Sequence, residues 1–519
     1  MTLQSIDIAV IAVYAIGLLA VALWVSREHD GASKDASDYF LAGRALPWWA
    51  IGASLIAANI SAEQIIGMSG SAWAMGIAIG VYEWTAAIAL IVVGKFLLPV
   101  FLKQKIYTMP QYLEQRFDNR VRNLMAVFWL VVYVFVNLTA ILWLGALAVN
   151  TVTGVDPSTG MIALAVFAVA YSLYGGLKAV AMTDIIQVVL LIVGGLFIAA
   201  ISLDRISDGA GIAAGFSTLV SAVPEKFDLI FTKDSEHYNL LPGISVLIGG
   251  MWVMHFSYWG FNQYIIQRAL AAKSTEEAQK GLLFAAFLKM LMPIIVVLPG
   301  VAAVILAPDL PAPDQAYPTM MTLLPAGLLG LVFAALIGAI VSSLASMMNS
   351  ISTIFTMDLY RHYSAGDASE QHLVKVGRIA AIAAMIVALV LAKPLLGEAE
   401  QAFQFIQEFT GFFTPGVCAI FGMGLFWSKT NANGALAMAF GSFLFSLLFR
   451  MFLPEIPFID RVSIVFVLCL LVGVFVSLTK PRQQVGNDIA GVDTSTSAAF
   501  NVGSLAVVAM LVALYATWW

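Results

Sequence analysis

The chain is a succession of apolar blocks separated by short polar segments. Blocks of about 20 apolar residues can each cross a hydrocarbon core roughly 30 Å thick as one helix. A helix pairs its backbone N–H and C=O groups within the same segment, so lipid need not supply hydrogen-bond partners. We therefore predict an all-α integral membrane protein with about fourteen transmembrane helices, at 5–26, 47–71, 76–101, 123–150, 159–177, 182–203, 241–265, 281–307, 320–358, 374–396, 402–427, 431–453, 461–479 and 499–518.

Composition agrees with this pattern. Of the 519 residues, 61% are apolar and only 11% are charged, whereas about a quarter of the residues of an average soluble domain are charged. Soluble globular, disordered and nucleic-acid-binding proteins are therefore excluded as classes. The net charge of −5 decides nothing further, because the placement of charge matters more than its sum in a membrane protein.

The placement of basic residues predicts the orientation in the membrane. If the N-terminus faces outward, 18 of the 26 Lys and Arg residues, Arg268 among them, fall in inner loops, 6 fall in outer segments, and Lys95 and Lys289 lie within spans. Inner loops of membrane proteins carry the excess of positive charge. We therefore expect the N-terminus on the outer side of the membrane, and the even number of predicted spans puts the C-terminus on the same side.

One predicted span, 47–71, is interrupted by polar residues near its middle, where residues 59–64 read NISAEQ. Lipid offers no partners for such side chains, so they must face protein or water. A polar interruption with small residues is typical of a discontinuous helix, whose break exposes backbone carbonyls that can coordinate a cation. The alternative is an ordinary polar contact between helices.

Charged residues lie inside the predicted spans. Glu83 and Lys289 are well inside, and Asp184 lies near the inner end of its span. Because an isolated charge at membrane depth costs at least a few kcal/mol, each should have a partner or a water-filled cavity. Glu83 and Lys289 could neutralise each other in a structural ion pair, or they could serve as hydrogen-bond acceptor and donor for a neutral polyol.

Hydroxyl and amide side chains in other spans are further candidates. The hydroxyls of Ser342 and Ser343 are hard oxygen ligands suited to a small cation, although such hydroxyls more often bond the preceding helical turn. Phe403 and Gln407 share one face of the 402–427 helix through their i,i+4 spacing. They would offer one ring and one amide to whatever that face lines.

The stretch 258–264 combines aromatic and amide residues at the predicted inner end of span 241–265. Aromatic residues at that depth are usually interface anchors, which is the expectation for Trp259 and Tyr264. The ring of Tyr258 could instead stack on the C–H face of a sugar. His255, a lone histidine in an apolar setting, is either a hydrogen-bonded core residue or part of the same site.

No phosphate-binding loop of the GxxxxGK[ST] form is present, and neither is an HExxH or CxxC metal motif. ATP-driven pumping therefore has no support in the sequence, and the energy for uphill transport would come from an ion gradient. We expect a transporter rather than an enzyme, with no organic cofactor.

Several long stretches carry a family pattern, namely 38–44 (DYFLAGR), 57–70, 171–177 (YSLYGGL), 259–268, 339–349, 404–411 and 424–441. In these stretches the chain resembles the solute:sodium symporter family, and within it the sodium/glucose cotransporter group and its bacterial sodium/galactose symporters. The resemblance implies a five-plus-five inverted-repeat core like that of the leucine transporters. Residues 1–46 would form an extra helix and inner loop, 47–427 the transport core, and 428–519 three C-terminal helices.

The resemblance also implies the ligand sites. A sodium ion would be bound by the carbonyls of Ala57, Ile60 and Ala339 and the hydroxyls of Ser342 and Ser343, with Asp184 on the sodium exit path. The side chains matching the sugar site are Gln64, Glu83, Lys289 and Gln407. The implied inner gate is Tyr258, and the implied outer gate consists of Met68, Tyr82 and Phe403.

Two positions depart from the sodium/galactose symporters, because a sugar-contacting serine is replaced by Ala86 and a sugar-contacting asparagine by His255. An unpaired hydroxyl in a dry pocket is costly, so such changes can alter substrate discrimination. Sodium-coupled import of a galactose- or glucose-type hexose by alternating access is the leading hypothesis. Inositol, an amino acid, a carboxylate or a vitamin as substrate stays open, as does an uncoupled sensor or channel.

Overall fold

The computed structural model describes residues 3–26, 44–363, 369–397, 401–479 and 491–519, with the backbone alone at 19, 22–26, 173–183 and 370. This part of the chain is helical and contains no strand, apart from one isolated bridge between Leu46 and Ala272. Most of the family stretch 38–44 lies outside the described residues.

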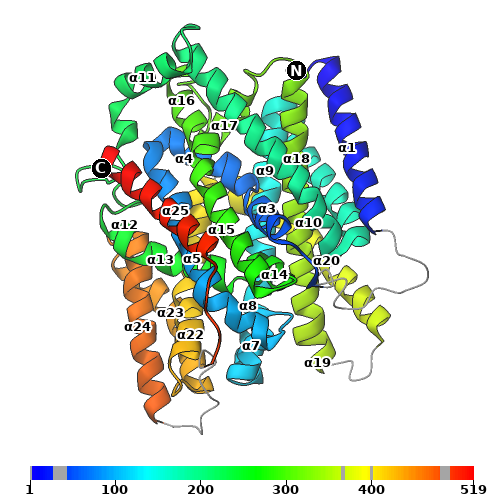
Figure 1. Cartoon of the computed structure of the whole chain (residues 1–519), viewed down its shortest axis with the longest axis vertical. Coiled ribbons are helices and arrows are strands. Elements are labelled where there is room, and N and C mark those ends of the chain that lie inside the picture. The colour runs from blue at the N-terminus through cyan, green and yellow to red at the C-terminus, as the bar shows by residue number, and fades with distance from the viewer. Residues whose placement is uncertain (1–2, 27–43, 364–368, 398–400, 480–490) are drawn as a thin grey trace.

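The α-helices follow the predicted apolar blocks (Figure 1). They are α1 (Ser5–Ser26), α3 (Trp48–Asn59), α4 (Met68–Met75), α5 (Val81–Val92), α6 (Leu98–Gln104), α7 (Met109–Arg116), α8 (Asn119–Val132), α9 (Thr139–Thr153), α10 (Pro157–Ile206), α11 (Ile212–Ala222), α12 (Ser245–Ile248), α13 (Gly250–His255), α14 (Gln263–Leu270), α15 (Thr275–Met292), α16 (Leu298–Leu306), α17 (Ala316–Met321), α18 (Leu328–Thr353), α19 (Arg361–Tyr363), α20 (Glu370–Leu396), α21 (Ala402–Thr410), α22 (Thr414–Phe426), α23 (Ala432–Phe452), α24 (Phe458–Thr479) and α25 (Ala498–Thr517).

Short segments of wider or tighter helix join many of them. The π-helical segments are η2 (Glu63–Gly67), η4 (Val93–Leu97), η5 (Tyr133–Leu138), η7 (Phe256–Phe261), η8 (Pro293–Val297) and η10 (Ile354–Tyr360). The 3₁₀ segments are η3 (Gly76–Gly80), η6 (Pro224–Phe227) and η9 (Pro313–Gln315). Single turns of π-helix inside α-helices are often found at functional sites.

Within the described residues, nine helical runs are long and apolar enough to cross a membrane, or ten if the bent pair α21 and α22 is one span. The all-helical membrane fold is therefore confirmed, while the count of fourteen stays a prediction. The predicted spans 159–177 and 182–203 fall within the single helical run α10. Its segments 157–172 and 184–206 are each apolar.

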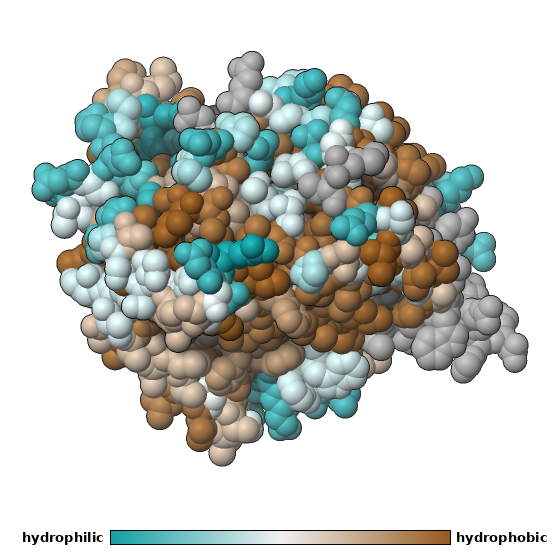
Figure 2. Space-filling model, turned by 90° about the horizontal axis from the view of Figure 1, so that it is seen from above, coloured by the Kyte–Doolittle hydropathy of each residue, from teal (hydrophilic) through white to brown (hydrophobic). Residues whose placement is uncertain are grey.

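The surface is unusually apolar for a folded chain. Large side chains such as Val13, Phe452 and Phe475 are at least 70% exposed, and in the view of Figure 2 apolar residues cover broad areas between hydrophilic patches. A soluble monomer rarely exposes contiguous apolar surface on this scale. A lipid environment accounts for it, since lipid removes the cost of exposing these side chains.

Three of the predicted spans are broken or bent in the structure. The span 47–71 ends as α3 at Asn59 and resumes as η2 at Glu63, as the polar run NISAEQ predicted. The span 241–265 was predicted to be continuous, but η7 ends at Phe261 and α14 begins at Gln263. The span 402–427 is also bent, by 45° between α21 and α22.

The second break has a local cause in Asn262. Its backbone is extended, with φ −81° and ψ 119°, and its side chain accepts a hydrogen bond from the amide of Tyr264, which caps the start of α14. Asparagine favours such capping positions over the interior of a helix. The hydroxyl of Tyr133 donates to the same Asn262 side chain at 2.5 Å, so a neighbouring helix fixes the break.

In the view of Figure 1 the N-terminal end lies at the top right and the C-terminal end on the upper left flank of the molecule. Near the N-terminus, the carboxylate of Asp7 accepts a hydrogen bond from the amide of Gly327. At the C-terminus, the carbonyl of Trp518 accepts one from the amide of Leu229 in the long 207–244 segment. The predicted even number of crossings requires both ends on one side. That both ends lie on one side of the membrane, and that this is the outer side, stays a prediction.

Candidate functional site

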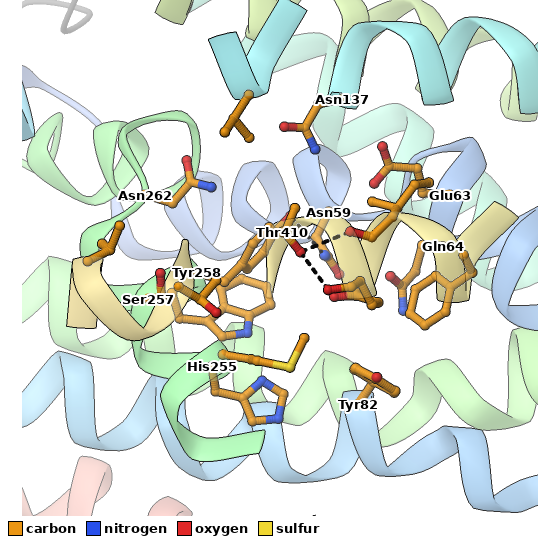
Figure 3. A pocket seen from close by; sticks show the side chains of 18 of the residues that line it. Asn59, Glu63, Gln64, Tyr82, Asn137, His255, Ser257, Tyr258, Asn262 and Thr410 are labelled. Carbon is orange, nitrogen blue, oxygen red and sulfur yellow. Dashed lines mark hydrogen bonds between the residues drawn. The ribbon is translucent and has the colours of Figure 1, made fainter. Parts of the chain in front are cut away.

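A cavity lies where the broken helices meet α5, η5, α15 and α21 (Figure 3). Its lining is rich in neutral hydrogen-bonding side chains and aromatic rings. It consists of Asn59, Glu63, Gln64, Tyr82, Glu83, Phe128, Trp129, Val132, Asn137, Met254, His255, Ser257, Tyr258, Trp259, Asn262, Lys289, Phe403, Ile406, Gln407, Thr410, Thr414 and Val417.

The polar centre of this cavity is a buried ion pair. Nζ of Lys289 on α15 lies 2.8 and 2.7 Å from the two carboxylate oxygens of Glu83 on α5, and both side chains are at most 2% exposed. A charge buried at this depth needs a hydrogen-bonded partner. The pair therefore neutralises itself while it presents a donor and an acceptor to the cavity.

The broken helix contributes amides to the same pair. The side-chain amide of Gln64 donates to Glu83, and Lys289 donates to the side-chain carbonyl of Asn59. The Asn59 amide donates in turn to the hydroxyl of Tyr258, at 3.2 Å. These contacts join residues on both sides of the break to η7, α5 and α15, so a ligand that alters them would act on the break itself.

His255 is hydrogen-bonded and lines the cavity. Its Nε2 lies 2.6 Å from the hydroxyl of Thr85, which itself donates to the carbonyl of Val81. Since the threonine proton is used there, Nε2 of His255 is the donor in this contact. His255 is thus a hydrogen-bonded residue that also lines the cavity, and its part in a sugar site stays a prediction.

Aromatic rings bound the cavity. Tyr82 and Phe403 meet edge to face with their ring centroids 5.2 Å apart. The ring of Trp259 lies 4.9 Å from the ammonium of Lys289, a cation–π contact. Trp259 and Tyr264 are each only 3% exposed. The expectation that they are interface anchors is therefore wrong, because the break at Asn262 turns this segment into the protein interior.

The first break also frees backbone carbonyls. The amide of Ser61 bonds to the carbonyl of Asn59 rather than to Ala57, and the amide of Gln64 bonds to Ser61 rather than to Ile60. Within the described chain, no backbone amide donates to the carbonyls of Ala57 and Ile60. These are the two carbonyls of the broken helix that the family resemblance implies for the sodium site.

The hydroxyl ligands of that implied sodium site belong to α18. Ala339, Ser342 and Ser343 are each at most 1% exposed. The Ser343 hydroxyl lies beside the hydroxyl of Tyr264 without a hydrogen bond of acceptable geometry. The Tyr264 hydroxyl itself donates to the carbonyl of Ala58 on α3. One tyrosine therefore links the end of α3 with the serine pair of α18.

Asp184 is a further buried charge at this place. Its carboxylate accepts hydrogen bonds from Ser342 and from Ser54, the latter at 2.7 Å. Arg268 lies 3.9 Å from the Asp184 carboxylate and donates to the same Ser54 hydroxyl at 3.0 Å. Arg268 is only 1% exposed, so its assignment to an inner loop is wrong. The break before α14 carries it into the interior.

The structure brings together most of the predicted sugar-site residues. Those in the cavity lining are Gln64, Glu83, Lys289, Gln407, Tyr258, His255, Tyr82 and Phe403. Ala86 and Met68 are buried but do not line the cavity. The thioether of Met68 instead accepts a hydrogen bond from Gln64 at 3.3 Å.

Sequence reasoning missed polar residues in the same lining, among them Asn59, Glu63, Asn137, Asn262 and Thr410. Figure 3 shows Glu63 and Asn137 on one side of the cavity and His255 and Tyr82 on the other. Asn59 and Glu63 belong to the polar run that predicted the break, so they could have been chosen. Asn137 is a single amide in an apolar span, and Asn262 stands beside Gln263 in the aromatic stretch 258–264, so both are signals that should have marked these residues.

The fold and this cavity define an all-helical membrane carrier with a central polar site. The sodium:solute symporter family model matches residues 39–441. The "Sodium/glucose cotransporter" of Vibrio parahaemolyticus is 47% identical over 539 aligned residues, which cover 100% of this chain and 99% of the relative. The chain therefore belongs to the sodium:solute symporter family.

More distant relatives agree with this assignment. "Sodium/glucose cotransporter 4" of Danio rerio is 33% identical, with 84% of this chain and 70% of the relative covered. Among solved structures, the substrate-bound, outward-open state of a Na⁺-coupled sialic acid symporter matches 93% of this chain and 100% of its own with a TM-score of 0.80 at 26% identity. A nucleobase-cation symporter matches in fold, with a TM-score of 0.55 at 14% identity.

Proposed function

We propose that the chain is a sodium-coupled symporter that imports a neutral sugar by alternating access. The observation that carries this proposal is the self-neutralised Glu83–Lys289 pair, set among neutral amides in a cavity bounded by rings. Sugar hydroxyls both donate and accept hydrogen bonds, so an amide, a carboxylate and an ammonium are matched partners for them. Full-length similarity to a protein named as a sodium/glucose cotransporter supports the same substrate class.

Sodium would bind at the first break. Its ligands are the carbonyls of Ala57, Ile60 and Ala339 and the hydroxyls of Ser342 and Ser343. All are oxygen atoms, which suits a hard cation, and the carbonyls of Ala57 and Ile60 lack backbone donors in the described chain. Asp184, which already accepts from Ser342, is the first acceptor on the proposed exit path.

The transport cycle follows from this placement. Because the break separates the sodium ligands Ala57 and Ile60 from the sugar ligand Gln64, binding of either solute biases the same element. Tyr258 closes the inner side, and Met68, Tyr82 and Phe403 close the outer side. Coupling of the two solutes is then reciprocal, each raising the affinity for the other by the same factor.

The inverted repeat is part of the proposal. The predicted spans divide into five from 47 to 203 and five from 241 to 427, with one span before and three after them. The first span of each set is broken, at 60–62 and at Asn262, as expected for repeats whose interface holds the ligands. Both termini lie on the outer side of the inner membrane in this arrangement.

A carboxylate substrate fits the cavity less well. Lys289 is the only lysine or arginine in the described lining, and Glu83 already neutralises it at 2.7 Å. Glu63, the other acidic side chain of the same lining, offers an anion no positive charge. Which neutral solute is preferred depends on His255 and Ala86, so galactose, glucose and myo-inositol are all candidates.

The test is uptake of labelled galactose, glucose and myo-inositol into proteoliposomes with an inward sodium gradient, and with potassium in its place. Accumulation of at least one of them in sodium alone is the expected result. No accumulation of any by well-folded protein would overturn the proposal. Exchange of labelled solute without accumulation in sodium would identify an uncoupled carrier instead.

A further inference from the structure

The start of α21 is held by a carboxylate from a distant segment. The amide of Ala402, the first residue of α21, donates to Oδ2 of Asp314 at 3.1 Å. Gln401, which precedes the helix, provides no side-chain cap of its own. Asp314 belongs to η9, in the segment between α16 and α17, so it supplies the missing cap from 88 residues away. A side-chain oxygen that accepts from the first amide of a helix satisfies a donor that has no partner within the helix.

The same carboxylate packs closely against α4, the helix that follows the break at 60–62. Asp314 is 3% exposed, and a Cβ added at Gly70 on α4 would lie 2.5 Å from Oδ1 of Asp314. That Oδ1 has no hydrogen-bond partner in the described chain. Next to it, the hydroxyl of Ser71 donates to the side-chain carbonyl of Gln401 at 3.4 Å. The contact therefore depends on close packing of η9, α4 and α21.

The held helix carries side chains of the cavity. Phe403 lies one residue after Ala402 and meets Tyr82 edge to face, and Gln407 follows one turn later in the lining. The start of α21 also packs on the end of η2, because a Cβ at Gly67 would lie 3.0 Å from Cβ and 3.4 Å from the backbone nitrogen of Phe403. A change at the start of α21 is thus transmitted to both residues through one rigid helix.

We infer that Asp314 is a positioning residue of the outer gate, a latch that holds α21, with Phe403 and Gln407, against α4 when the outer side of the cavity is closed. The inference rests on the proposed alternating access, and it adds a residue outside the cavity that sets how readily the outer side opens. Opening the outer side requires α21 to move away from α4, which exposes the Asp314 carboxylate to water.

This movement couples the gate to pH. Burial raises the pKa of Asp314 to about 7, although the Ala402 amide opposes the rise. Because this pKa is raised in the latched form, the latch is fully stabilised below the ordinary value of 3.8 and loses that stability as the pH rises through about 7. The latched form should therefore weaken about tenfold relative to the open form between pH 6 and pH 8.

Few other titratable groups face this latch. Of the elements packed on η9, α4 and α9 carry no titratable side chain, η2 carries Glu63, and α17 carries the buried Tyr317. On α21 itself the acid is Glu408, which pairs with Arg450 and Arg461 at the far end of the helix. Glu398 and Glu400 lie outside the described residues. None of the described groups contributes to the raised pKa of Asp314.

The test measures access to the cavity from outside. Thr410, whose hydroxyl bonds to its own helix, is replaced by cysteine in the full-length protein in vesicles, and its rate of labelling by a membrane-impermeant thiol reagent is measured at pH 6 and pH 8. The buried Cys418 and Cys469 provide the background in protein without the new cysteine. Asp314→Asn keeps the size and the acceptor oxygen, and Asp309→Asn removes the exposed carboxylate of the same segment.

After correction for the reactivity of the thiol itself, labelling with Asp314 intact should be about tenfold faster at pH 8 than at pH 6, and Asp309→Asn should behave in the same way. Asp314→Asn should label slowly at both pH values, and Asp314→Ala, which loses the cap, should label quickly at both. An equal pH response with and without Asp314 would overturn the latch. The same labelling is also measured with sodium and with potassium in its place. Labelling that does not respond to sodium, with the pH response kept, would count against the proposed symport and not against the latch.

Discussion

Two buried ion pairs near the first break are built in opposite ways. Lys289 and Glu83 are in direct contact, with Nζ 2.7 and 2.8 Å from the carboxylate oxygens. Arg268 and Asp184 are 3.9 Å apart, and the hydroxyl of Ser54 bridges them by donating to Asp184 and accepting from Arg268. Both pairs are almost completely buried, so burial alone does not distinguish them.

The difference teaches what each pair is suited for. A direct pair has its charge already neutralised, and a neutral ligand can add hydrogen bonds to it without introducing charge. A pair separated by hydroxyls leaves the carboxylate with weaker, exchangeable partners that a passing cation can replace. In the proposed function the first pair therefore belongs to the sugar cavity and the second to the sodium path.

Breaking the direct pair should have the largest effect. Lys289→Met leaves Glu83 buried without its partner, which should lower the free energy of unfolding by about 3–5 kcal/mol and abolish sugar uptake. Thermal unfolding of the purified protein measures the first effect. The double variant Lys289→Met with Glu83→Gln should recover most of the stability but none of the uptake. A double variant as unstable as the single one would contradict the description of a self-neutralised pair.

Removing an amide beside the direct pair should have the second-largest effect. Gln64→Ala deletes a donor to Glu83, and a hydrogen bond to a charged group is worth about 1.5–3 kcal/mol. The proposed bond from Gln64 to a sugar hydroxyl is lost as well, so we expect sugar affinity to fall by one to two orders of magnitude and uptake to be lost at ordinary concentrations. The protein should stay folded, with a lowered unfolding temperature. Near-normal uptake by this variant would remove Gln64 from the sugar site.

A change in the bridged pair should alter the dependence of uptake on sodium rather than the affinity for sugar. Asp184→Asn removes the charge but keeps the size and an acceptor for Ser54 and Ser342. The sodium concentration for half-maximal uptake should rise about tenfold, as expected for a charged hydrogen bond, while sugar affinity in saturating sodium stays the same. An equal loss of affinity for both solutes would mean that Asp184 serves the fold and not the ion.

A single neutral hydroxyl should have the smallest effect. Ser343→Ala removes a proposed sodium ligand whose hydroxyl makes no other hydrogen bond in the described chain. Loss of about 1 kcal/mol corresponds to a rise of about fivefold in the sodium concentration for half-maximal uptake. Ser346→Ala, which removes a hydroxyl that accepts from Arg268, is the matched control on the same helix. An unchanged sodium dependence in Ser343→Ala would sink the assignment.

Much of this molecule could be predicted from its sequence. The apolar blocks predicted the helices, and the polar run 59–64 predicted the first break. The isolated charges of Glu83 and Lys289 indicated that each needs a partner or a polar cavity, with pairing between them as one possibility. These features follow from local pattern and from the cost of charge in lipid. The family resemblance supplied the residues that the structure then places in one cavity.

The rest depends on backbone geometry that a pattern of apolar residues does not encode. Glu63 and Gln64, Asn137 and Tyr258 come from the π-helical segments η2, η5 and η7. One extra residue in a helical turn rotates a side chain out of its α-helical register, so spacing could not assign these residues to one face. The break at Asn262 was missed because its cap involves one asparagine, and this hid the burial of Arg268.

The claim at the centre of this account is that one broken helix joins a sodium site to a sugar cavity. Equilibrium binding of galactose, glucose and myo-inositol to the purified protein, in saturating sodium and in potassium, tests it most directly. Sodium should tighten binding of the transported solute, and that solute should tighten binding of sodium by the same factor. A solute that binds equally well in sodium and in potassium, in protein that also binds sodium, would contradict the account.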